Sequence, residues 1–181
     1  TEKEFELLTW AIGLHQGVAR PQGKATQYLS AVRDVGTVYR SAGGRGYSSN
    51  AELDFHTDGS DIVVLTCYNR AREGGMSMVS SSVRAHNVVR AERPDLAEIL
   101  TQPFYFSRQQ EQAPDEAPCY PNPVFDMLGN TFCSKWNRNR INSAQKIEGV
   151  PQLTVQQREA MDVLDEVLRR PDLMYTMWLE P

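Results

Sequence analysis

The sequence predicts a single domain that is mainly β with helices at its flanks. Residues 62–68 form a near-continuous apolar run rich in β-branched side chains, as expected of a buried central strand. Residues 125–137 have the pattern of a hairpin, with a Gly-Asn pair near the middle. Residues 154–168 repeat their apolar side chains as an amphipathic helix does. A chain of 181 residues, 40% of them hydrophobic, can fill one core.

The first third of the chain is predicted to contain a helix, a short strand and a long loop. Residues 4–12 are rich in helix formers with one apolar stripe, and Gly13 supplies a stop. Residues 14–19 are interpreted as a short strand. Residues 22–50 contain few large apolar side chains, so we expect a loop-rich approach with a Gly-rich tip at residues 41–46.

The middle of the chain is predicted to be a strand followed by a helix. Residues 76–80 alternate in polarity, and the serine cluster that ends them can cap a helix beginning at Val83. Val83 and Val88 are expected to face the core, and Pro94 ends or kinks the helix. His86 lies on this helix, where we expect a surface or packing role rather than metal ligation.

The last third is predicted to hold a surface excursion, a hairpin and a helix. Residues 109–123 contain four prolines and three acidic residues, which favours an excursion over the surface. In the hairpin, residues 128–130 form the turn. Thr154 and Gln157 have the spacing of a capping box that opens the final helix, which Pro171 closes. The core-facing side chains of that helix are expected to be Met161, Leu164, Val167 and Leu168.

Composition and charge limit the class of protein. A formal net charge of −4 argues against a general affinity for nucleic acid. No apolar run is long enough for a membrane span, and the acidic residues 1–6 do not resemble a signal peptide. Cys67, Cys119 and Cys133 are odd in number and lack paired zinc spacing, which favours reduced thiols and a cytoplasmic protein.

The segment His56-Thr57-Asp58 is the strongest chemical signal in the sequence. On an extended strand, residues i and i+2 point to the same face, so the His56 imidazole and the Asp58 carboxylate could reach one cation. They would be two ligands of the two-His-one-carboxylate triad, which binds non-haem Fe(II) and leaves positions open. The alternative is structural, with His56 hydrogen-bonded to a neighbouring carboxylate at a strand end.

Other segments accompany this motif in a fixed order. They are Arg45 to Asn50, Glu52 to Ser60, Gly74 to Ser80, Arg93 to Leu96, Pro103 to Phe106, Trp136 to Arg138, Glu148 to Pro151 and Leu153 to Ala160. Together they resemble the TauD/TfdA family of Fe(II)- and 2-oxoglutarate-dependent oxygenases, especially its branch related to clavaminate synthase, over residues 47–181. A weaker likeness covers residues 5–40.

The resemblance implies a double-stranded β-helix, the jelly-roll architecture, with helices on one side. It implies Fe(II) held by His56, Asp58 and a distal His, with 2-oxoglutarate as cosubstrate. O2 would then oxidise a C–H bond of a small-molecule substrate, with release of succinate and CO2. Ser77 stands where the family has a hydroxyl that binds a 2-oxoglutarate carboxylate, although it could be an ordinary strand serine. Asn50 is similar in position to family side chains that line the substrate pocket, but Asn in a turn before a strand is also expected from local hydrogen bonding. Asn137 projects from a strand end and could bind substrate, or it could be a polar strand end within the solvated basic run of residues 135–140.

The resemblance further predicts what residues 1–181 lack. The family places its second His ligand, and an Arg that pairs with 2-oxoglutarate, after the segment equivalent to residues 178–181. Neither His15 nor His86 stands at that position. Residues 1–181 are therefore expected to be one oxygenase domain, incomplete at the C-terminus. Two other classes stay open: a non-catalytic jelly roll that binds a small molecule, and a metal-dependent hydrolase. The substrate and the oligomeric state also stay open.

Overall fold

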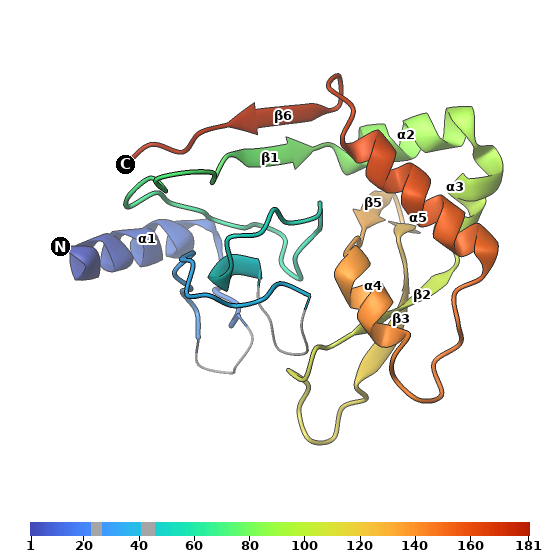
Figure 1. The fold of residues 1–181 in the computed structure, drawn as a ribbon, viewed down its shortest axis with the longest axis horizontal. Coiled ribbons are helices and arrows are strands. Elements are labelled where there is room, and N and C mark those ends of the chain that lie inside the picture. Colours follow the sequence, from blue (N-terminus) through green and yellow to red (C-terminus); the bar gives the residue numbers. More distant parts are fainter. Residues whose placement is uncertain (23–26, 41–45) are drawn as a thin grey trace.

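The computed structural model describes residues 1–22, 27–40 and 46–181. Helix α1 and the irregular segments of the N-terminal half lie at one end of the molecule, and α2, α3, α4 and α5 gather at the other (Figure 1). The elements in chain order are α1 (Glu2–Gln16), η1 (Gly46–Ser48), β1 (Ser77–Ser80), α2 (Ser82–Glu92), α3 (Pro94–Leu100), β2 (Pro103–Ser107), β3 (Cys119–Pro123), β4 (Phe125–Leu128), β5 (Thr131–Ser134), α4 (Arg138–Ala144), α5 (Val155–Leu168) and β6 (Met174–Met177).

The strands form three separate antiparallel pairs, β1 with β6, β2 with β3, and β4 with β5. The first pair joins segments far apart in the sequence and places Ser77 opposite Met177. The third pair is the predicted hairpin, in which Leu128 lies opposite Thr131. Gly129 in its turn has a φ of 62°, a left-handed conformation that glycine adopts without a Cβ clash.

The hydrophobic core lies where α2, α3 and α5 pack against one another, and it also includes buried side chains of β2 and of α4, which packs against β2. Its most deeply buried large side chains are Val89, Leu96, Leu100, Phe104, Phe106, Val124, Ile141, Met161, Leu164 and Val167. Helix α1 contributes no buried residue. The packed part of the described fold is therefore built by the second half of the chain, and the N-terminal half lies against it more loosely.

Several boundaries predicted from capping patterns are confirmed. Thr154 and Gln157 form the reciprocal capping box that opens α5, and the four predicted apolar side chains of that helix are buried. Ser81 caps α2 by accepting a hydrogen bond from the Arg84 amide. Pro94 stands at the start of α3, where its missing N–H leaves no hydrogen bond unmade.

Other predictions about local structure are wrong. Residues 62–68 form no strand, and Ile62 and Val63 are 54% and 61% exposed. A strand needs a hydrogen-bonded neighbour, and no segment of the described chain pairs with this run. Residues 14–19 were expected to be extended, but α1 continues through Gln16 because an internal glycine weakens a helix without ending it. Val83 is exposed, since the register of α2 buries Ala85 and Val89 instead.

The described residues combine antiparallel strands with helices, and they do not form a complete jelly roll. A jelly roll requires its strand pairs to join into two larger sheets, whereas the three pairs in residues 77–177 stay separate. The expected Gly-rich tip lies outside the described residues, apart from Gly46.

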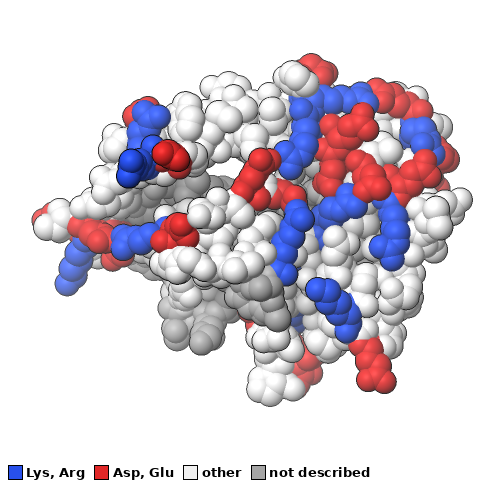
Figure 2. Space-filling view, in the orientation of Figure 1, with Lys and Arg blue, Asp and Glu red and all other residues white. Residues whose placement is uncertain are grey.

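Charged side chains of both signs are interspersed over the helical end of the molecule, while the surface over β1 and β6 carries few charges (Figure 2). The helical end includes the ion pair of Arg170 with Glu92, at 2.5 Å, which links the end of α5 to α2. Within the part of the chain that the structure describes, no helix has the length and apolarity of a membrane span.

Candidate metal and cosubstrate site

The segment that carries His56 and Asp58 lies side by side with residues 135–137, which connect β5 to α4. His56 makes an isolated antiparallel bridge with Asn137. The backbone N–H of Thr57 donates to the Trp136 carbonyl over 2.7 Å. The two candidate ligands thus stand on an extended segment, although it is too short to be a strand.

The His56 ring is held in one orientation. Its Nδ1 lies 2.8 Å from the Asp54 carbonyl oxygen. Because a carbonyl oxygen only accepts, the neutral imidazole carries its proton on Nδ1 and keeps a free lone pair on Nε2. An imidazole whose other nitrogen donates to a backbone carbonyl is the usual arrangement of a metal-binding histidine.

The lone pair of His56 is close to the carboxylate of Asp58. The Nε2 atom lies 3.9 Å from Asp58 Oδ1, and the two side chains are 34% and 55% exposed. Neighbouring ligand positions on one ion, at bonds of about 2.0–2.2 Å, lie about 3 Å apart, so Nε2 and Oδ1 would have to approach each other by about 1 Å to share it. One nitrogen and one carboxylate oxygen, both open to solvent, are therefore close enough to become two ligands of an Fe(II) site after a small movement of the side chains.

The described residues bring no third ligand to this pair, since they contain no group of three or more His, Cys, Asp or Glu side chains close enough to share a metal ion. His86 packs its ring against Phe125 and Phe132, with centroids 5.1 and 5.3 Å away, which confirms the expected packing role. His15 lies in the last turn of α1.

Ion pairs hold the chain leading into His56. The Arg40 guanidinium lies 2.6 Å from the Asp54 carboxylate. The backbone carbonyl of the same Asp54 holds the His56 ring. Arg169, at the end of α5, lies 2.8 Å from Glu52 and over the ring of Phe55, 5.7 Å from its centroid. These contacts connect residues 52–55 to two other parts of the fold.

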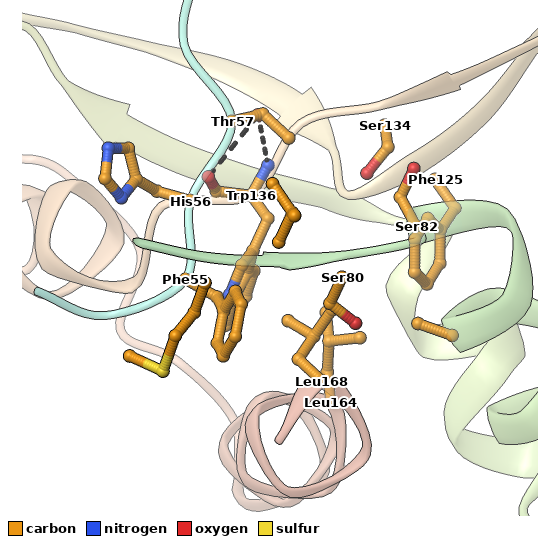
Figure 3. A pocket seen from close by; sticks show the side chains of 13 residues that line it. Phe55, His56, Thr57, Ser80, Ser82, Phe125, Ser134, Trp136, Leu164 and Leu168 are labelled. Carbon is orange, nitrogen blue, oxygen red and sulfur yellow. Dashed lines mark hydrogen bonds between the residues drawn. The ribbon is translucent and has the colours of Figure 1, made fainter. Parts of the chain in front are cut away.

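A small cavity of about 110 Å³ lies behind this segment, and most of its lining is apolar. It is lined by Phe55, His56, Thr57, Met78, Val79, Ser80, Ser82, Ala85, Phe125, Ser134, Trp136, Leu164 and Leu168. The His56 ring lies at the margin of this group, away from Ser82 and Phe125 (Figure 3). The cavity therefore lies behind the segment that carries the two candidate ligands.

The residues after Trp136 anchor the site to α5. Arg138 lies 2.7 Å from Asp165 and also pairs with Asp162. Burial raises the pKa of Asp165, and the hydrogen bond from the Arg138 guanidinium opposes this effect. The Arg138 guanidinium therefore offsets part of the cost of burying this carboxylate.

The predicted cosubstrate and substrate residues lie in different places. Ser77 begins β1, but it is not among the residues that line the cavity beside His56. Asn50 lines a separate open hollow together with Tyr39, Arg40 and Glu52. The Asn137 side-chain oxygen accepts a hydrogen bond from the Arg140 amide over 3.0 Å and so caps α4, while its backbone lies beside His56. The functional roles of these three residues stay predictions.

The sequence interpretation missed the residues that support the site. Thr57, Trp136 and the pair of Arg138 with Asp165 were given no role. The position of Thr57 between two candidate ligands was an available signal. No such signal identifies Asp162 and Asp165 as partners of Arg138, because the helix periodicity that predicts α5 places its Asp residues on a solvated face.

Comparison with known proteins places the chain in a family. Residues 1–181 match the family described as "Taurine catabolism dioxygenase TauD, TfdA family". The chain therefore belongs to the TauD/TfdA family, as its motifs predict.

Two relatives illustrate how the chain relates to longer proteins. It is 31% identical over 183 aligned residues to FR-33289 synthase of Streptomyces rubellomurinus, which covers 100% of the chain and 54% of that protein. It is 26% identical over 141 residues to the taurine hydroxylase-like protein SAT17 of Stachybotrys chartarum, covering 72% of the chain and 34% of that protein. The chain thus spans about half, or less, of the length of these relatives.

Proposed function

We propose that this chain belongs to an Fe(II)- and 2-oxoglutarate-dependent oxygenase that oxidises a C–H bond of a small molecule. The observation that carries the proposal is the geometry of His56 and Asp58 in a TauD/TfdA chain. Nε2 and Oδ1 lie 3.9 Å apart, and the Asp54 carbonyl leaves Nε2 free to bind a metal. In the complete enzyme we expect these strands to join a jelly roll.

His56 and Asp58 would hold the metal through Nε2 and a carboxylate oxygen. Bound iron would supply the activation of O2, coupled to conversion of 2-oxoglutarate to succinate and CO2. The Ser77 hydroxyl would donate to a carboxylate of 2-oxoglutarate. Asn50 and Asn137 would contact the substrate, Asn137 through its side-chain nitrogen because its oxygen already accepts from Arg140.

We propose that the third protein ligand comes from outside residues 1–181. The described residues hold two ligands at this site, and His86 is committed to packing against Phe125 and Phe132. Residues 1–181 expressed by themselves are accordingly expected to form no succinate. The three free cysteines fit a reducing, cytoplasmic compartment.

A non-catalytic module that binds a small molecule is the second candidate. The two-ligand site and the largely apolar cavity beside it favour this reading. It predicts binding of a small molecule without consumption of 2-oxoglutarate.

The test is anaerobic titration of Fe(II) into the full-length protein, followed by calorimetry. Wild-type protein is expected to bind one Fe(II), and His56→Ala or Asp58→Ala is expected to weaken binding by more than about 100-fold, since a direct ligand matters more than its supporting shell. His86→Ala is the matched control and should leave the affinity unchanged. Equal Fe(II) affinity in the His56→Ala variant would contradict the proposed site.

A further inference from the structure

Thr57 stands between the two proposed metal ligands, and its hydroxyl is turned toward the backbone of Trp136 (Figure 3). We propose that Thr57 is a positioning residue that fixes the His56 and Asp58 side chains relative to each other by clamping their segment to Trp136. The inference rests on the proposed function, because the clamp matters for activity only where the two side chains bind a metal.

The clamp consists of three hydrogen bonds between Thr57 and the backbone of Trp136. The Thr57 N–H donates to the Trp136 carbonyl over 2.7 Å. The Thr57 hydroxyl accepts from the Trp136 N–H over 2.9 Å and donates to the Trp136 carbonyl over 3.4 Å. A single bond would let the segment rotate about it, whereas several bonds between the same two residues fix both their distance and their relative direction.

The partner of the clamp is well anchored. Trp136 is 3% exposed. The next residue, Asn137, caps α4, and Arg138 after it pairs with Asp165 on α5. The Trp136 backbone therefore has little freedom to follow the metal-ligand segment if that segment moves.

The metal-ligand segment has few other backbone constraints. Residues 51–76 contain no helix or strand. Among the described residues, the backbone of residues 51–76 is joined to another part of the chain at the bridge between His56 and Asn137, where the Thr57 N–H donates to the Trp136 carbonyl. The position of His56 relative to Asp58 should therefore depend strongly on the residue between them.

The threonine hydroxyl can be tested separately from the rest of the contact. Valine has nearly the shape of threonine, but it cannot accept a hydrogen bond, so Thr57→Val leaves the buried Trp136 N–H without a partner. Serine keeps the hydroxyl. Both variants keep the Thr57 backbone bond, so a difference between them reports the hydroxyl alone.

The experiment titrates Co(II), as a spectroscopic substitute for Fe(II), into the full-length protein. Thr57→Val should raise the Co(II) dissociation constant about 10-fold, the effect expected on losing a group that orients a ligand. Thr57→Ser should bind as wild type does. Thr101→Val is the matched control, because the Thr101 hydroxyl also bonds to a backbone group, the Glu98 carbonyl at 2.8 Å, and both residues lie outside residues 51–76.

Amide hydrogen exchange provides a readout that requires no metal. The Trp136 amide should exchange faster in Thr57→Val than in wild type or Thr57→Ser. Faster exchange with unchanged Co(II) affinity would make Thr57 a structural residue only and overturn the inference. If Thr57→Val does not fold, Thr57→Ala replaces it, since alanine also lacks the hydroxyl. Co(II) affinity in Thr57→Ala equal to that of Thr57→Ser would likewise overturn it.

Failure of the proposed function has a different signature. Wild-type protein that binds no Co(II) would show that His56 and Asp58 are not metal ligands, and it would remove both proposals. Wild-type binding that His56→Ala abolishes and Thr57→Val leaves intact would remove only the positioning role.

Discussion

Replacing Arg138 with methionine should destabilise the protein by about 2–3 kcal/mol, because it leaves a buried carboxylate without its partner. The Arg138 and Asp165 side chains are 25% and 24% exposed, and their charged groups lie 2.7 Å apart. Removing one partner of a fully buried pair costs about 3–5 kcal/mol, and an exposed pair contributes about 0–1. Because both side chains are about three-quarters buried, the expected loss of unfolding free energy lies between these limits. Asp162, whose side chain is 65% exposed, should add little.

The assay is equilibrium urea unfolding of the full-length protein at pH 7. Arg33→Met is the matched control, because Arg33 pairs with Glu2 at 2.6 Å while both side chains are more than half exposed. The control should lose less than about 1 kcal/mol. A loss in Arg138→Met no larger than in Arg33→Met would refute the claim that this pair ties α4 to α5. Co(II) affinity should fall with Arg138→Met as well, since Arg138 anchors Trp136.

Three further predictions concern stability and cosubstrate binding. Leu164 lines the cavity and is 1% exposed, so Leu164→Ala should lower the free energy of unfolding in urea by about 3–5 kcal/mol. Val155 lies on the same helix but is 82% exposed, so Val155→Ala should lower it by less than about 0.5 kcal/mol. Ser77→Ala should weaken 2-oxoglutarate binding, measured by calorimetry, by about 0.5–1.5 kcal/mol and leave Fe(II) affinity unchanged; equal losses for both ligands would argue against its role. Burial raises the pKa of Asp165 in the folded state above its ordinary value of 3.8. The contribution of Asp165 to the free energy of unfolding is therefore most favourable below pH 3.8, and it is lost as the pH rises through the raised pKa. Wild-type protein should therefore lose stability relative to Asp165→Asn as the pH rises through that range, and a constant difference would contradict this assignment.

Features with strictly local causes could be predicted from the sequence. The capping box of Thr154 with Gln157 needs only two side chains three residues apart, and it opens α5 as expected. The hairpin turn at Gly129 needs a residue that adopts positive φ, and the sequence provides one. In both cases the residues that determine the structure lie within one turn of each other.

Features that depend on distant partners could not be predicted in the same way. The apolar run at residues 62–68 has the composition of a buried strand, but composition does not supply a neighbour to pair with. The same limit applies to the site. The spacing of His56 and Asp58 puts both on one segment, but the contact of Thr57 with Trp136 joins residues 79 positions apart. Likewise, the cap that occupies the Asn137 oxygen depends on where α4 begins.

The central claim is that His56 and Asp58 hold the iron of a 2-oxoglutarate-dependent oxygenase. It is tested most directly by measuring the succinate that the full-length protein forms from 2-oxoglutarate in air with Fe(II) and ascorbate. Wild type and His86→Ala should form succinate with matching O2 consumption. His56→Ala and Asp58→Ala should show neither. Succinate formation by His56→Ala at the wild-type rate, or none by a wild-type protein that binds Fe(II) and 2-oxoglutarate, would contradict it.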